Sequence, residues 1–170
     1  MTAAVVALAL QACADFGASL GAGEMVSVEL PSVSDDIDEL DAALVTVTGG
    51  DGETAELVVR VADDADSRRR GLMGVRQLPE DTGMLFTWDG GEREGGFWMR
   101  DTLIPLDIAF VGTDQQIEAV LTMAPCTSDP CPTYDPGIPY VAAVEVPAGW
   151  FDANGVEVGD ELTWVRANEG

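Results

Sequence analysis

The sequence contains no lysine and no histidine, and its only basic residues are eight arginines among 170 residues. Without histidine, imidazole metal sites and the Ser-His-Asp and Cys-His mechanisms are excluded. Acidic residues number 31, so the formal net charge at pH 7 is −23. Such a charge repels nucleic-acid phosphates and anionic membrane surfaces, so binding to either is not expected. The acidity suits a salty habitat or, alternatively, one cationic partner.

Hydrophobic runs long enough to span a bilayer, about 20 residues, are also absent. The longest run opens the chain, "MTAAVVALALQAC", and residues 3–10 have the length of a signal-peptide core. "LQAC" resembles a bacterial lipobox, in which Cys13 would be lipidated. Because no basic residue precedes Arg60, we interpret residues 1–13 as a truncated lipoprotein signal, or else as a weakly helical or disordered N-terminus. The predicted location is extracytoplasmic, as a cell-envelope lipoprotein or a secreted protein.

Residues 14–43 carry eight acidic groups and no cation, which is the composition of a linker. This segment would hold a domain away from the membrane, or it is a plain disordered tail. Residues 44–168 then form one domain.

Within this domain, short strand-like runs alternate with turn signals. "GGDGE" predicts a hairpin turn between "ALVTVT" and "AELVVRVAD", because glycine and aspartate tolerate positive φ. Residues 66–78 predict one short helix, with Asp66 or Ser67 as its N-cap and Pro79 as its stop. The fold class is therefore mostly β, a small antiparallel barrel or sandwich with one covering helix. Further predicted strands are "GMLFTW", "LDIAFV", "QIEAVLTM", "YVAAVEVP" and "ELTWVR".

Four ordered blocks resemble the uncharacterised DUF192 (UPF0127) family over roughly residues 45–165. The blocks are "RRRGLMGVRQLPEDTGMLF", "FWMRDTLIPLDIAFV", the tyrosine of "CPTY" and "YVAAVEVPAGWFDANGVEVGD". Arg100 and Asp101 stand where the family usually has Lys and Asn. The resemblance supports the predicted fold and an exported location, and it implies no particular activity.

Two acidic residues lie in apolar strand patterns. Asp107 shares one strand face with Ala109 and Val111, and Glu145 occupies a similar position in "YVAAVEV". A buried carboxylate is costly unless it is paired or protonated. Asp107 and Glu145 are therefore either an acid/base pair or two separate acids held by arginine or backbone amides, and the expected arginine partner is Arg68 or Arg100.

Aromatic and charged residues suggest a ligand cleft, because tryptophan beside Asp and Arg can stack on a sugar ring or another flat ligand. Core or lid packing is the alternative for the same aromatics. The candidate ligand-binding residues are Trp88, Trp98, Arg100, Asp101, Asp107 and Tyr134. We interpret Arg68, Met73, Met99 and Glu145 as structural.

Cys126 and Cys131 are five residues apart in a proline-rich loop, so they can close a small disulfide in an exported protein. The pair lacks the further ligands of a zinc site, and no phosphate-binding glycine loop is present. We therefore predict no metal and no cofactor.

The sequence favours a monomeric, non-enzymatic envelope module that binds an unknown small or extended ligand. The alternative is a hydrolase of sugar or peptide bonds, with Asp107 and Glu145 as acid and base.

Overall fold

The fold is that of a computed structural model, which describes residues 32–167. The predicted signal with Cys13, and most of the predicted linker, lie outside the described residues. No helix among those described is long and apolar enough to cross a membrane. The elements are α1 (Asp35–Asp38), β1 (Ala42–Thr48), β2 (Thr54–Ala62), α2 (Ala65–Arg70), β3 (Thr82–Thr87), β4 (Phe97–Trp98), β5 (Leu106–Val111), β6 (Ile117–Met123), β7 (Thr133–Tyr134), β8 (Ala142–Pro147), α3 (Trp150–Ala153) and β9 (Glu161–Arg166).

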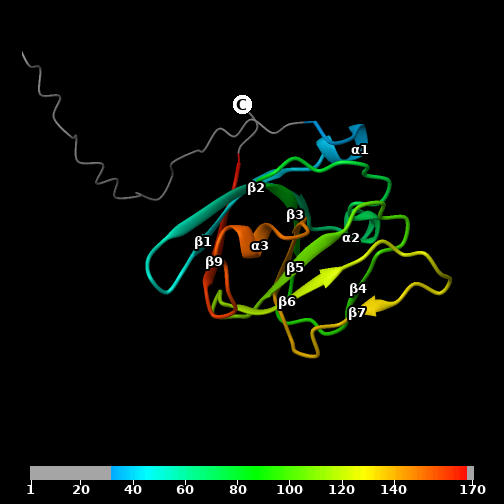
Figure 1. The fold of residues 1–170 in the computed structure, drawn as a ribbon. Helices are drawn as coiled ribbons and strands as arrows, with labels where there is room; N and C mark the ends of the chain where they lie inside the picture. Colours follow the sequence, from blue (N-terminus) through cyan, green and yellow to red (C-terminus); the bar gives the residue numbers. More distant parts are fainter. Residues whose placement is uncertain (1–31, 168–170) are drawn as a thin grey trace, which may run out of the picture.

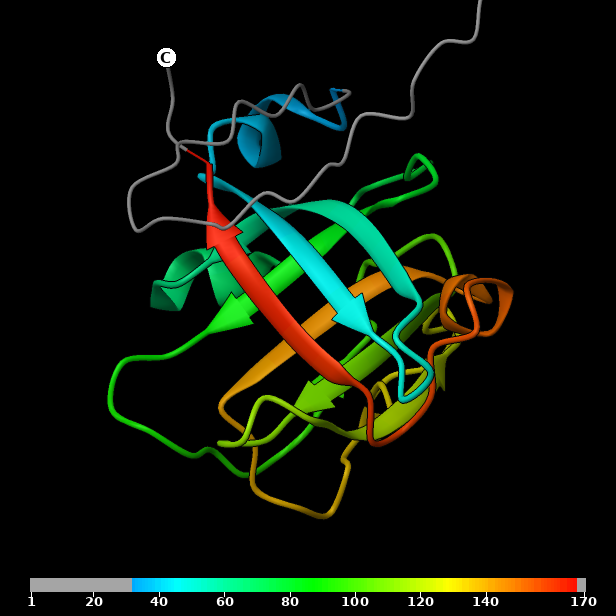
Figure 2. The same ribbon diagram turned by 90° about the vertical axis from the view of Figure 1, so that its left-hand side faces the viewer.

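Seven strands form one curled sheet in the order β6-β5-β8-β3-β2-β1-β9 (Figure 1). The hairpin of β1 and β2 and the neighbouring β9 form one wall, which faces the viewer in Figure 2. The two edge strands, β6 and β9, approach each other at one end of the sheet. There the amide of Leu162 in β9 donates to the carbonyl of Gln115, just before β6, at 2.7 Å. The sheet is therefore a partly closed barrel, which confirms the predicted fold class.

Both faces of the central strands are buried. The inner face of the curled sheet packs residues of β1, β2, β5, β8 and β9 together with Trp150 and Phe151 of α3. The outer face of β3, β5 and β8 is covered by Ile37 of α1, by Leu72 after α2 and by Met99 after β4. All six residues of β5 are buried as a result, as the apolar character of both its faces predicts.

The predicted hairpin and the five further predicted strands are confirmed. One pair departs from the antiparallel pattern, since β2 and β3 run parallel. Parallel neighbours need a crossover connection, and residues 63–81, which contain α2, provide it. The two-stranded sheet of β4 and β7 was not predicted, because each strand has only two residues.

The predicted helix is shorter than expected. α2 ends at Arg70 because Gly71 takes φ +50°, and its N-cap is Asp64, whose carboxylate accepts the amides of Asp66 and Ser67. Two further short helices, α1 and α3, accompany it. Residues 32–43, the part of the predicted linker that the structure describes, are folded against the domain, since Ile37 is 1% exposed in the outer core.

Candidate functional site

An open groove of about 720 Å³ lies between the end of α2 and the turn that follows β4. It brings together three of the predicted ligand-binding residues, Trp98, Arg100 and Asp101. Its walls also include Met73, which we had interpreted as structural, and four residues that were not predicted. The complete lining is Asp66, Arg69, Arg70, Met73, Gly74, Trp98, Arg100 and Asp101.

Two loops are joined by one backbone contact to form the groove. Gly74 lies just after α2 at φ +79°, and its amide donates to the carbonyl of Asp101 at 2.9 Å. Asp101 itself has φ +55°, a region that aspartate tolerates better than most residues. Because Met99 is 1% exposed and anchors the turn in the core, Arg100 and Asp101 are presented at the surface.

Trp98 is the exposed aromatic residue of the groove. In β4 successive side chains alternate, so Phe97 packs edge-on against Phe86 and Phe110 in the core while Trp98 remains 47% exposed. The guanidinium carbon of Arg100 lies 5.9 Å from the Trp98 ring centroid. This distance is within the range of a cation–π contact, so a single ligand could contact both the flat indole and the guanidinium group.

The wall behind Trp98 is held by the cysteine loop. β7 pairs with β4 through Trp98 and Thr133, and a disulfide joins Cys126 to Cys131 with their Cα atoms 5.6 Å apart. This confirms the predicted disulfide. Tyr134 secures the same loop, because its hydroxyl accepts the amide of Ala124 at 3.0 Å.

Trp88 and Tyr134, also predicted to bind ligand, lie outside the groove. Both pack on the outer core. The Trp88 ring contacts Tyr140 edge-on and has the guanidinium groups of Arg68 and Arg93 5.5 and 5.9 Å from its centroid. Arg68 also donates to the carbonyl of Thr87 at 2.8 Å. The contacts of Trp88 and Arg68 are therefore those of packing.

Asp107 is held by a backbone amide, one of the two alternatives predicted for it, and not by an arginine. Its Oδ2 atom accepts the amide of Gly149 at 2.6 Å, just before α3. Its other oxygen, Oδ1, is buried without a partner among the described residues. Arg68 and Arg100 bind elsewhere, as described above, so the prediction that one of them neutralises Asp107 is wrong. Asp107 also lies outside the groove.

Glu145 lies on the opposite face of the sheet from Asp107. It pairs across the sheet with Ile108 and with Met84 of the outer core, whereas Asp107 pairs with Val146 of the inner core. Burial raises the pKa of the Glu145 carboxyl from 4.5 to about 8, which favours the neutral form at pH 7. With the sheet between them, the two carboxyl groups do not face a common cleft, and the acid/base pair of the hydrolase alternative is not formed.

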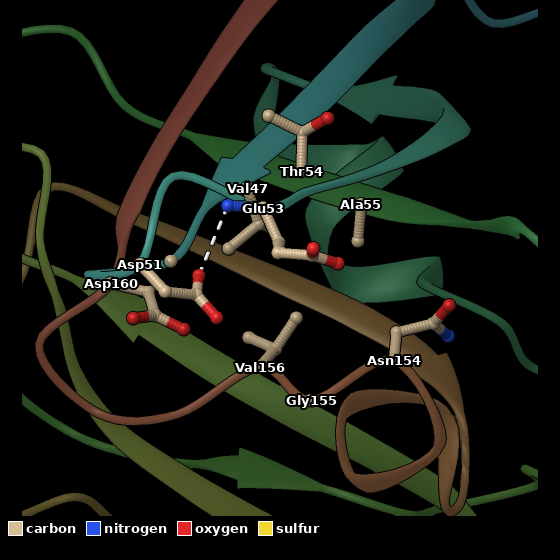
Figure 3. Close-up of a pocket in the computed structure, with 10 residues that line it drawn as sticks. Val47, Asp51, Glu53, Thr54, Ala55, Asn154, Gly155, Val156 and Asp160 are labelled. Carbon is tan, nitrogen blue, oxygen red and sulfur yellow. Dashed lines mark hydrogen bonds between the residues drawn. The ribbon is translucent and has the colours of Figure 1, made fainter.

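A second hollow, of about 140 Å³, lies between the β1–β2 hairpin and the segment after α3 (Figure 3). Two of the three acidic residues that line it serve as turn caps: Asp51 accepts the amide of Glu53 at 3.0 Å, and Asp160 accepts that of Glu157 at 2.8 Å. Within residues 32–167, no group of three His, Cys, Asp or Glu side chains is arranged to hold a metal ion. We therefore assign no ligand to this hollow.

The unpredicted residues of the groove had a signal in the sequence. Six of the eight arginines fall between residues 68 and 100, including the run "RRR", which is unusual in so acidic a chain. Which of these arginines share one surface depends on the crossover to β3 and on the Gly74–Asp101 contact, and neither can be derived from periodicity.

Comparisons with known proteins agree on the family. The family model of DUF192, described as an uncharacterised ACR, matches residues 45–164. Among solved structures, a Sinorhizobium meliloti protein provisionally called a transcription regulator has a TM-score of 0.68 and 32% identity, with 74% of this chain and 95% of that chain covered. A protein of unknown function from Novosphingobium aromaticivorans has a TM-score of 0.67 and 29% identity, with 80% and 94% covered. Comparison with curated proteins gives no match. This chain belongs to the uncharacterised DUF192 family.

Proposed function

We propose that this protein is a non-enzymatic, extracytoplasmic module that binds a small or extended ligand in the groove beside Trp98. The observation that carries the proposal is the half-exposed Trp98 indole with the Arg100 guanidinium 5.9 Å from its centroid. A large aromatic surface left in water is unfavourable unless a partner covers it. The groove thus offers one flat apolar surface and several charged groups within reach of a single ligand.

The groove has the character of a binding site more than of a catalytic one. Its two carboxylates each lie beside an arginine: Asp66 is 3.0 Å from Arg69, and Asp101 is 4.0 Å from Arg100. Both carboxylates are largely exposed to water, whereas acid–base catalysis is typically carried by desolvated groups with shifted pKa values. The transcription role suggested for the Sinorhizobium protein is not extended to this chain, because a net charge of −23 opposes contact with DNA.

A ligand panel read by thermal shift tests the groove. Sugars, amino acids, short peptides and aromatic acids are titrated into the wild type and into Trp98→Ala. We expect at least one ligand whose affinity falls about five- to tenfold in Trp98→Ala, because a lost aromatic stack is worth about 1 kcal/mol.

Leu103→Ala is the matched control. Leu103 is 50% exposed, near in sequence, and outside the groove, so its removal should leave the same affinities unchanged. Binding that is equally strong in wild type and Trp98→Ala for every ligand of the panel would contradict the proposed site.

The disulfide supports an extracytoplasmic location, because such bonds persist in oxidising compartments. We propose that Cys13 carries a lipid in this location, with the secreted form as the alternative. In its native host the protein should partition into membranes, and Cys13→Ser should release it into the medium or periplasm. Wild-type protein found entirely in a soluble fraction would reject the anchor and leave the groove unaffected.

A further inference from the structure

We infer, resting on the proposed function, that the ligand of the groove is an uncharged sugar chain whose hydroxyls are equatorial. The first observation is that the charged side chains of the groove are matched within the protein. Arg69 lies 3.0 Å from Asp66, and Arg100 lies 4.0 Å from Asp101. Arg70 also has an interaction within the chain. Because these charges are balanced locally, the groove is not built to select an ion, and an uncharged ligand leaves both ion pairs in place.

The other charges around the ligand point the same way. A net charge of −23 repels a chain of carboxylates or phosphates, and the two lining aspartates do so at close range. A cation that entered the groove would instead meet its three arginines, Arg69, Arg70 and Arg100. An uncharged polar ligand is opposed by neither set.

Each ion pair places hydrogen-bond donors beside acceptors. An arginine only donates and an ionised aspartate only accepts, so the pair suits a ligand group that does both, and a hydroxyl is such a group. Two neighbouring sugar hydroxyls can accept from the guanidinium and donate to the carboxylate. The four side chains of the two pairs are between 57% and 91% exposed. Exposed pairs contribute little to stability, so they can adjust to the hydroxyls at small cost.

The indole of Trp98 defines the shape of the ligand. It is 47% exposed, and the Arg100 guanidinium stands near the outer limit of a cation–π contact, so much of the ring surface is in water. A pyranose with equatorial hydroxyls has flat apolar faces of axial C–H groups, which stack on an aromatic ring. Its hydroxyls then point outward, in the plane of the sugar, toward the charged rim. An axial hydroxyl would hold the sugar away from the indole.

The size of the groove favours a chain. It is open and has a volume of about 720 Å³, whereas sites for free small molecules usually enclose most of the ligand surface. One ring over Trp98 leaves room for neighbouring rings beside the two ion pairs. The groove is therefore matched to a segment of a longer uncharged polysaccharide.

Calorimetric titration at constant ionic strength with three β-1,4-linked tetrasaccharides tests the inference. Cellotetraose is uncharged and has equatorial hydroxyls. Tetraglucuronate has the same rings with a carboxylate at each C6, and mannotetraose is uncharged with an axial hydroxyl at each C2. Cellotetraose should bind at least about tenfold more tightly than tetraglucuronate and several-fold more tightly than mannotetraose.

Three variants locate the binding. Trp98→Ala should weaken cellotetraose about five- to tenfold, because the stacking surface is lost. Asp101→Asn keeps a residue type that tolerates the φ of +55° at this position, and it should weaken cellotetraose several-fold because a charge-assisted hydrogen bond is lost. Leu103→Ala is the control and should bind cellotetraose as the wild type does. Circular dichroism of each variant checks that it is folded.

The outcomes separate this inference from the proposed function. Tetraglucuronate binding as tightly as cellotetraose would overturn the uncharged ligand, and equally tight mannotetraose would overturn the equatorial geometry. In both cases, a loss of affinity in Trp98→Ala would still place the ligand in the groove. Unchanged cellotetraose affinity in Asp101→Asn would overturn the role given to the ion pairs. If cellotetraose does not bind, the inference fails, and the panel described under Proposed function decides separately whether Trp98 binds any other ligand.

Discussion

At the scale of single residues, the two acids buried in the sheet have different chemical situations. One oxygen of the Asp107 carboxylate accepts the Gly149 amide at 2.6 Å, and the other is buried without a partner among the described residues. Glu145 is buried in an apolar environment, and this burial alone raises its pKa to about 8. Removing the ionisable group should therefore change the stability of the protein in opposite directions at the two positions.

Replacement of Glu145 by Gln should stabilise the protein at neutral pH. The unfolded chain ionises near pH 4.5 and the folded chain near 8, so wild-type stability falls as pH rises between these values and is constant above them. Glutamine keeps the neutral shape and removes this loss. We compare the free energy of unfolding of Glu145→Gln with that of the wild type, measured in urea. The difference between the two proteins should be about 3 kcal/mol more in favour of Glu145→Gln at pH 7 than at pH 4.

Asp107→Asn is the matched control for that experiment. It removes a charge that is hydrogen-bonded, so stability at pH 7 should fall, by about 1–3 kcal/mol. A Glu145→Gln variant whose stability follows the wild type at every pH would show that Glu145 is not held neutral in the fold.

At the scale of elements, the groove depends on short pieces of structure that are weak on their own. β4 and β7 have two residues each, and two-stranded sheets are marginal in water. The disulfide Cys126–Cys131 and the Tyr134 hydroxyl hold β7 in place behind Trp98. The cysteine loop thus stabilises β4, the strand that carries the exposed indole of Trp98.

Changing both cysteines to serine should loosen this element and leave the large sheet folded. The disulfide joins two cysteines that are five positions apart, so its removal should cost about 2 kcal/mol of stability. Trp98 fluorescence should become more accessible to a neutral quencher such as acrylamide, with Trp98→Phe used to subtract the signal of the other tryptophans.

The far-ultraviolet circular dichroism of the double serine variant should stay that of the wild type, because the seven-stranded sheet does not include β4 or β7. Unchanged quenching of Trp98 would show that the cysteine loop does not support the groove.

At the scale of the whole molecule, self-repulsion is the main electrostatic effect. A net charge of −23 on 170 residues destabilises the compact state. Only a few acids are paired in the described part, for example Asp63 with Arg166. The remaining charge is available to be screened by salt.

Raising NaCl from about 0.1 to about 1 M should raise Tm by several degrees, because the screening length falls from about 10 to about 3 Å. Potassium chloride should act equally, and sucrose at matched osmolality should act less. A Tm that is flat or falls with salt would indicate that local pairing already offsets the repulsion.

The amino-acid sequence by itself determined the strands. Alternation and β-branched runs locate β1, β2, β3, β5, β6, β8 and β9, and the turn between β1 and β2 follows from "GGDGE". These are local effects, since a pleated strand places alternate residues on each face and glycine permits positive φ. The same alternation places Asp107 and Glu145 in buried strands, and the spacing of Cys126 and Cys131 predicts their disulfide.

Only the tertiary structure decided which of these residues meet. Asp107 and Glu145 lie on opposite faces because the β5–β8 register pairs Asp107 with Val146 and Ile108 with Glu145, and a shift of one residue would have reversed one of them. Trp98, Arg100 and Arg69 share a groove because the Gly74 amide binds the Asp101 carbonyl. Register and loop contacts are long-range properties, so local sequence patterns identified only Trp98, Arg100 and Asp101 as ligand-binding residues of the groove, and the folded chain alone brought them together with the other five.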